Sequence, residues 1–213
     1  MKHFFLIVIF SWLTIYSTAQ KVLSEAVVNY NMHLEDATDA SIENAFNNAT
    51  LTLYIKGAMV RTDFKSNMVN QSIIFNGKNT VATILKEMGN NKFMISLTQN
   101  DWIDFNKKYD DVKFVVSNET KNILGYECKK ATATLKDQST FTVYFTNALI
   151  MPNKEYNRQF KGLEGFPLEY ESSIQNWKVK YTVVNIGFNL VSTNKFDLPT
   201  TGYRVLQYGK EAL

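Results

Sequence analysis

The chain has 213 residues, 45% of them hydrophobic and 14% aromatic, which is enough for one ordinary domain with a real core. Lysine and arginine (23) nearly balance aspartate and glutamate (20), and the net charge of +3 is scattered along the chain. The sequence shows no basic stripe of the kind that binds nucleic acid, so a nucleic-acid partner is not expected. A single cysteine excludes an internal disulfide and, with only two histidines, gives no basis for a metal site or another cofactor.

The first nineteen residues have the pattern of a secretory signal. A short basic start, Lys2-His3, precedes the mostly apolar run Phe4 to Tyr16, and the small residues Ser17-Thr18-Ala19 predict cleavage before Gln20. The run is shorter than the roughly 20 residues of a membrane-spanning helix; the alternative is a buried N-terminal helix or an uncleaved anchor. We expect an exported protein, in the periplasm of a Gram-negative bacterium or outside the cell. Residues 1–19 would be the signal peptide and 20–213 one domain without a transmembrane segment.

The dominant period of the remaining chain is two, which predicts β-strands. The Asn76-Gly77 dipeptide, between two alternating runs, predicts a hairpin. Helix signals are few: short helices are predicted at 41–48 and 99–109, the second with a loop as its alternative, and a helical turn within 153–162. The predicted strands cover residues 22–34, 50–56, 59–64, 71–75, 80–85, 92–98, 113–117, 127–136, 140–146, 168–172 and 178–186.

The most informative block of the chain runs from Leu124 to Tyr170 and contains glycines and one proline at positions that set backbone shape. Gly125 before Tyr126 predicts a turn at the start of a strand. Gly162 and Gly165 predict a loop with positive φ values. Pro167 fixes its own φ and favours an extended residue before it, so the next strand should begin at this point.

The glutamates and the cysteine of this block could take part in catalysis, but structural roles explain them more simply. Leu168 and Tyr170 would share one face of a strand, which places Glu169 and Glu171 together on the other as solvated carboxylates. Cys128 could be a nucleophile only beside a base. His33 is the single histidine after residue 19 and lies on the polar face of the first strand. We therefore expect a half-buried structural cysteine and no enzyme.

Several strands place large apolar residues on one face and polar residues on the other. So many strands must twist and curl, but the sequence offers little helix to cover the apolar face. Two interpretations stay open: a core packed by its own side chains, or a concave cavity for an apolar ligand. The candidate ligand-binding residues on this face are Phe141, Val143, Phe145, Trp177, Val179 and Tyr181.

Parts of the sequence resemble an uncharacterised family of exported bacterial proteins, which is itself similar to the LolA-like superfamily of lipoprotein carriers. The resemblance implies a mainly β fold, an incomplete antiparallel β-barrel with a few short helices lidding its open side. In the carriers, the concave apolar face holds acyl chains, although no carrier residue matches this chain one by one. The segments that resemble the family are 76–78, 86–92, 125–131, 141–146, 160–171 and 196–203, with Gly125, Tyr126, Cys128, Gly162, Gly165, Pro167, Leu168 and Tyr170 in structural roles.

The sequence thus predicts an exported, non-catalytic protein that binds a hydrophobic or lipid-like ligand in the concave face of a half-barrel. The alternative is a protein–protein interaction module of the cell envelope, with a fully packed core and no small ligand. An open apolar cavity on the sheet would favour the first hypothesis, and a face filled by its own side chains would favour the second.

Overall fold

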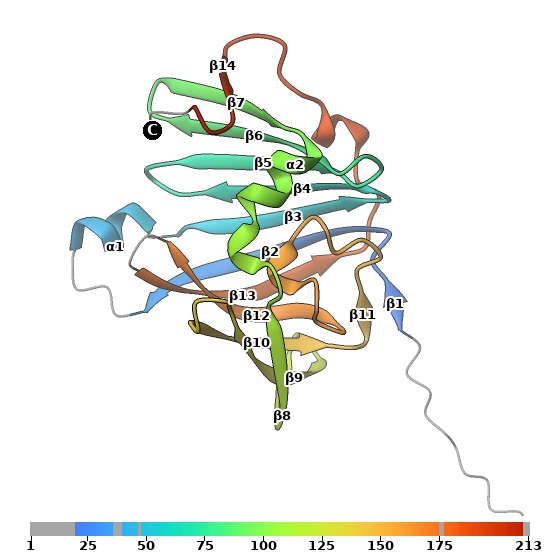
Figure 1. The fold of residues 1–213 in the computed structure, drawn as a ribbon. Coiled ribbons are helices and arrows are strands. Elements are labelled where there is room, and N and C mark those ends of the chain that lie inside the picture. The colour runs from blue at the N-terminus through green and yellow to red at the C-terminus, as the bar shows by residue number, and fades with distance from the viewer. Residues whose placement is uncertain (1–19, 36–39, 47, 175–176, 211–213) are drawn as a thin grey trace, which may run out of the picture.

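The structure is a computed structural model that describes residues 20–35, 40–46, 48–174 and 177–210. The predicted signal peptide therefore lies outside the described residues. The fold is mainly β: a curled, open sheet of twelve strands with a few short helices (Figure 1). The strand order is β14-β7-β6-β5-β4-β3-β2-β13-β12-β10-β9-β8, with β14 and β8 at the two edges.

Every predicted strand is present, 50–56 and 140–146 with the predicted ends and the others with shifted ends. All neighbours in the large sheet are antiparallel except β14, which runs parallel to β7. The prediction missed β14 and the short parallel pair of β1 and β11. The strands are β1 (Lys21–Val22), β2 (Glu25–Glu35), β3 (Thr50–Lys56), β4 (Met59–Lys65), β5 (Asn70–Asn76), β6 (Val81–Met88), β7 (Asn91–Leu97), β8 (Lys113–Ile123), β9 (Tyr126–Thr134), β10 (Thr140–Thr146), β11 (Leu149–Ile150), β12 (Phe166–Ile174), β13 (Trp177–Gly187) and β14 (Arg204–Gln207).

The helices are short, and all but η3, which was not predicted from the sequence, lie close to the predicted positions. They are α1 (Ala40–Phe46), α2 (Gln99–Phe105), and the 3-10 turns η1 (Lys107–Tyr109), η2 (Arg158–Phe160) and η3 (Thr193–Phe196). Thr98 caps α2: its hydroxyl accepts a hydrogen bond from the Asp101 amide, and the Asp101 carboxylate accepts one from the Thr98 amide. This reciprocal capping box fixes the start of a helix that is too short to be stable by itself. No helix of the described residues has the length and apolarity to cross a bilayer.

The family-motif residues shape the sheet, though not all in the predicted way. Leu124 and Gly125 both have positive φ and form the two-residue turn of the β8–β9 hairpin, as a type I′ turn requires. The prediction of positive φ at Gly162 and Gly165 is wrong. Gly165 is needed for close approach, because a Cβ there would overlap the Thr146 carbonyl and lie 2.7 Å from Cδ2 of Phe145.

Pro167 lies in β12, an interior strand, where a proline is normally excluded because it cannot donate to the ladder. The sheet tolerates it because the pairing of β10 with β12 shifts register between Tyr144 and Phe145, and Phe145 is opposite Pro167. Its carbonyl accepts a hydrogen bond from the buried Tyr30 hydroxyl at 2.9 Å. Phe166 begins β12, as the sequence predicted.

Candidate functional site

The inner face of the sheet is the one that α2 crosses (Figure 1). Over β2 to β7, its side chains form three rows that run perpendicular to the strands, because antiparallel pairing places them opposite one another. The first row is Ala26, Ile55, Val60, Phe75, Ala82 and Leu97, the second Val28, Leu53, Thr62, Ile73, Ile84 and Ile95, and the third Tyr30, Leu51, Phe64, Gln71, Lys86 and Phe93.

The first row is closed, since none of its six side chains is more than 3% exposed. Trp102 of α2 packs over it, with its ring 5.3 Å from that of Phe75, and is itself 2% exposed. The indole N–H donates to the Glu155 carbonyl at 2.8 Å, which joins α2 to the loop of residues 151–163. Phe160 of that loop packs on Tyr170, with a ring distance of 4.8 Å. Helix and loop together form the lid of this end.

The third row lies beyond the lid and is open. Tyr30 is buried, but the other five members of the row are only half-buried. An apolar groove of about 520 Å³ occupies this end of the inner face, within the range of roughly 300–1,000 Å³ typical of small-molecule sites. Nine of its twelve lining residues are apolar or aromatic; the full set is Phe46, Leu51, Thr62, Phe64, Met68, Val69, Gln71, Ile73, Lys86, Met88, Trp177 and Tyr181.

The groove has one rigid aromatic wall and an adaptable rim. Tyr181 stacks on Tyr170 with ring centroids 4.7 Å apart, and burial raises the pKa of Tyr181 above its ordinary value of 10.0, so its hydroxyl stays neutral. At the rim, Met68 is 63% exposed and Met88 half-buried. Methionine side chains are flexible and fit apolar ligands of irregular shape. The arrangement can hold an apolar molecule.

The six residues predicted on the apolar face divide between the two ends. Trp177 and Tyr181 line the groove. The other four, Phe141, Val143, Phe145 and Val179, belong to the closed core, and none is more than 8% exposed. Leu168 and Tyr170 also lie in that core, while Tyr126 is half-buried against it.

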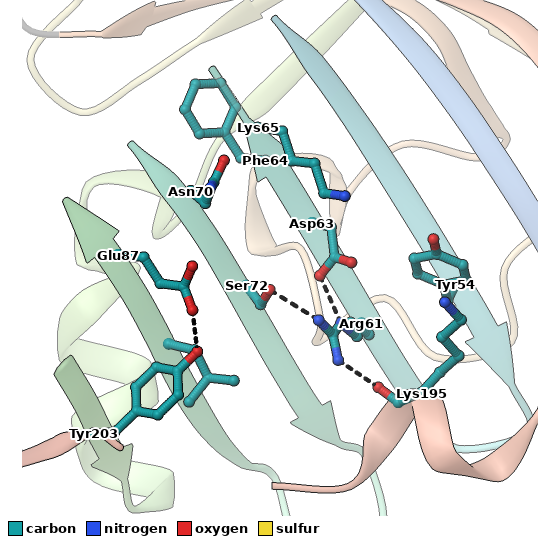
Figure 2. Close-up of a pocket in the computed structure, with 11 residues that line it drawn as sticks. Tyr54, Arg61, Asp63, Phe64, Lys65, Asn70, Ser72, Glu87, Lys195 and Tyr203 are labelled. Carbon is teal, nitrogen blue, oxygen red and sulfur yellow. Dashed lines mark hydrogen bonds and ion pairs between the residues drawn. The ribbon is translucent and has the colours of Figure 1, made fainter. Parts of the chain in front are cut away.

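The outer face of β3 to β7 carries a separate, polar hollow of about 350 Å³ (Figure 2). Figure 2 shows the Arg61 guanidinium bonded to Asp63, to Ser72 and to the backbone carbonyl of Lys195. The Tyr203 hydroxyl donates to Glu87 nearby. These bonds attach the segment after β13 to the outer face, so we assign them a structural role.

Glu169 and Glu171 share one face of β12, as predicted, but the expectation that both are solvated is wrong. Glu169 is 7% exposed, with both oxygens 2.8 Å from the Lys121 ammonium, and it also accepts from the Thr182 hydroxyl at 3.0 Å. Glu171 is half-buried and accepts from the Thr142 amide. The Lys121 charge and the Thr182 hydrogen bond compensate the buried Glu169 carboxylate, which is the normal condition for keeping one inside a protein.

Cys128 and His33 do not form a catalytic pair. Cys128 is fully buried on β9, more than the predicted half-burial, and burial raises the pKa of its thiol to about 11, so the reactive thiolate is disfavoured. His33 is exposed on β2, next to Lys180 of β13 in the sheet register. Among the described residues, no three His, Cys, Asp or Glu side chains come together as a possible metal site.

No protein-family model matches the chain, and no curated protein matches it. Similar solved structures include PNGF-II (14% identity, TM-score 0.48, covering 86% of this chain and 31% of that chain) and MucB (8%, 0.42, 84% and 58%). LprF from Mycobacterium bovis is another (10%, 0.37, 79% and 88%). This chain thus spans less than a third of PNGF-II. Each of these TM-scores is below 0.5, so membership of the exported family and of the LolA-like superfamily stays a prediction.

Sequence reasoning missed most of the groove. The alternation predicted the strands that carry Leu51, Phe64 and Ile73, but such a pattern does not tell a covered position from an open one. One signal was available. Lys86 interrupts the inner-face series Ala82, Ile84, Lys86, Met88, and a lysine on an otherwise apolar strand face indicates a place where the cover ends.

Proposed function

We propose that the protein binds a hydrophobic or lipid-like ligand in the apolar groove and does not catalyse a reaction on it. The observation that carries this proposal is the contrast along the inner face: the first row is closed under Trp102, while the third row opens into a groove of about 520 Å³. Binding of an apolar ligand is favourable here because the ligand displaces water from the apolar side chains of Leu51, Phe64 and Ile73.

The proposal also includes the location of the protein and its domain organisation. Residues 1–19 direct export, to the periplasm of a Gram-negative bacterium or outside the cell. Residues 20–213 form one domain. An envelope-protein partner, as an interaction module would have, stays an alternative, but that hypothesis was tied to a fully packed core, and the open groove favours the ligand.

The test is direct binding of an alkyl ligand to the purified protein. Native mass spectrometry would detect a co-purifying lipid, and titration with a fluorescent fatty acid would give a dissociation constant. Bound ligand should also raise the free energy of unfolding, by about 2.7 kcal/mol when its free concentration is 100 times the dissociation constant. If the wild-type protein bound neither lipid nor fatty acid, the proposal would be rejected.

A steric variant locates the binding. Thr62 is half-buried in the middle of the groove, so Thr62→Phe should fill it and weaken binding by about tenfold or more. Thr132→Phe makes the same change at an exposed position of β9 and should bind as the wild type does. Equal affinities of the two variants would show that the ligand lies elsewhere.

A further inference from the structure

One charged side chain interrupts the apolar lining of the groove. Lys86 follows Ala82 and Ile84 on the inner face of β6, and it is the one charged residue among the twelve that line the groove. Its cross-strand neighbours on that face, Gln71 on β5 and Phe93 on β7, carry no charge.

Lys86 has no counter-ion within the described part of the chain. No described carboxylate lies within 4.0 Å of its ammonium group. The adjacent carboxylate, Glu87, points to the opposite side of the sheet, where it accepts from Tyr203 and lies 3.2 Å from the Lys92 ammonium (Figure 2). Because β-strand side chains alternate between faces, Glu87 cannot turn to neutralise Lys86 without breaking the strand register.

An ammonium group at an apolar site, with no counter-ion among the described residues, selects the ligand. An apolar molecule that covered Lys86 would remove water from the ammonium group without replacing it, which costs free energy. A ligand with an anionic group would instead form a charge-assisted hydrogen bond there, stronger than one between neutral groups. The lysine therefore favours anionic ligands over neutral ligands of the same chain length.

The groove is long enough to hold one extended chain. Lys86 lies on β6, whereas Trp177 and Tyr181 lie on β13, five inter-strand steps away in the sheet. At about 4.8 Å a step, this is a path of about 24 Å along the curled sheet. One acyl chain spans about half of the roughly 30 Å hydrocarbon core of a bilayer, or about 15 Å. A single chain with its head group at Lys86 can therefore lie across the strands, covering somewhat more than half of this path, with its methyl end toward Trp177.

We propose that the groove takes a single-chain anionic amphiphile of the fatty-acid class, whose carboxylate pairs with Lys86 while its chain extends toward Trp177. This inference rests on the proposed function and adds to it the class of ligand and its direction in the groove.

The charge preference is tested with oleate and oleyl alcohol, which differ only in the head group. The wild-type protein should bind oleate about tenfold more tightly or better. Lys86→Met should lose this preference while still binding oleyl alcohol. Lys65→Met removes the same charge from an exposed position of β4 on the outer face and should keep the preference.

If the wild type bound both ligands equally, or if Lys86→Met kept the preference, this inference would be overturned while the proposed function stood. Binding of neither ligand would reject both.

The direction is tested by fluorescence quenching with brominated fatty acids. Bromine near the methyl end of the chain should quench Trp177 more than bromine near the carboxylate. In the protein without the predicted signal peptide, which contains Trp12, Trp177→Phe should remove this difference, because the remaining Trp102 is buried under the lid. Stronger quenching by bromine near the carboxylate, or equal quenching at both positions, would contradict the proposed direction.

Discussion

The two ends of the inner sheet face have the same strands and similar side chains, yet they differ in what covers them. At one end, the row from Ala26 to Leu97 is buried under Trp102 and the lid loop. At the other, the row from Leu51 to Phe93 is half-buried and opens into the groove. An apolar strand face can therefore be core or binding surface, and what covers it decides which.

The lid explains why the boundary lies where it does. Helix α2 is seven residues long and covers only one end of strands that are seven or eight residues long at β3 to β7. On the groove side, Phe46 of α1 packs beside Phe64, with ring centroids 6.3 Å apart, and forms part of the groove wall. The stability of the fold should thus come from the lidded end, and binding from the open end.

The largest expected effect is a difference in the free energy of unfolding between two Phe→Ala variants, one at each end of the inner face. Phe75 is 1% exposed under the lid, whereas Phe64 is half-buried in the groove, on the adjacent strand. Phe75→Ala should lower the free energy of unfolding by about 3–5 kcal/mol, because it leaves a cavity in a packed core. Phe64→Ala should cost about 1–2 kcal/mol, since its site already contacts solvent. Chemical denaturation of both variants measures the difference.

The same two variants should rank in the opposite order in ligand binding. Phe64→Ala should weaken binding of a fluorescent fatty acid, and Phe75→Ala should leave it largely unchanged under conditions where the variant is folded. If Phe64→Ala were the more destabilising of the two, the distinction between a stabilising end and a binding end would be wrong.

A smaller effect is expected from loosening the lid at its helix cap. Thr98→Ala removes the hydroxyl that accepts from the Asp101 amide, so it should cost about 1 kcal/mol. Hydrogen exchange should accelerate in α2 more than in β3, because the cap holds the helix and not the sheet. Thr132→Ala, at an exposed strand position, is the control. Unchanged exchange in α2 would show that Trp102 alone holds the lid.

The smallest expected effect comes from the ion pairs that join β2 to β13. The Glu35 carboxylate lies 2.6 Å from Lys180 and 3.2 Å from Lys178, and the hydrogen bond from Lys180 is the main cause that lowers the pKa of Glu35 below its ordinary value of 4.5. A lowered folded-state pKa gives stability that is present above pH 4.5 and is lost as the pH falls through the lowered value. Glu35→Gln should therefore cost under about 1 kcal/mol at pH 7.

Denaturation at several pH values tests this assignment. The difference between wild type and Glu35→Gln should disappear below the lowered pKa, because both side chains are then neutral. Glu43→Gln, an exposed change on α1, should show little difference at any pH. A Glu35→Gln difference that persisted in acid would assign its effect to packing and not to charge.

Local chemistry made most of the fold predictable. Alternation located the strands, and Pro167 located the start of β12 at Phe166, because proline restricts the residue before it. The role of Gly165 could not be predicted in the same way: its reason is the carbonyl of Thr146, which only the tertiary fold brings near. The burial of Glu169 was likewise missed, because its partner Lys121 comes from β8, 48 residues earlier.

The sequence by itself determined the strands, their two faces and the apolar character of one face, because these follow from the two-residue period of an extended chain. Only the tertiary structure decided which part of that face is core and which part is groove. That division depends on where α2 and the lid loop lie, and their positions follow from contacts between residues far apart in sequence, such as Trp102 with Phe75 and with Glu155.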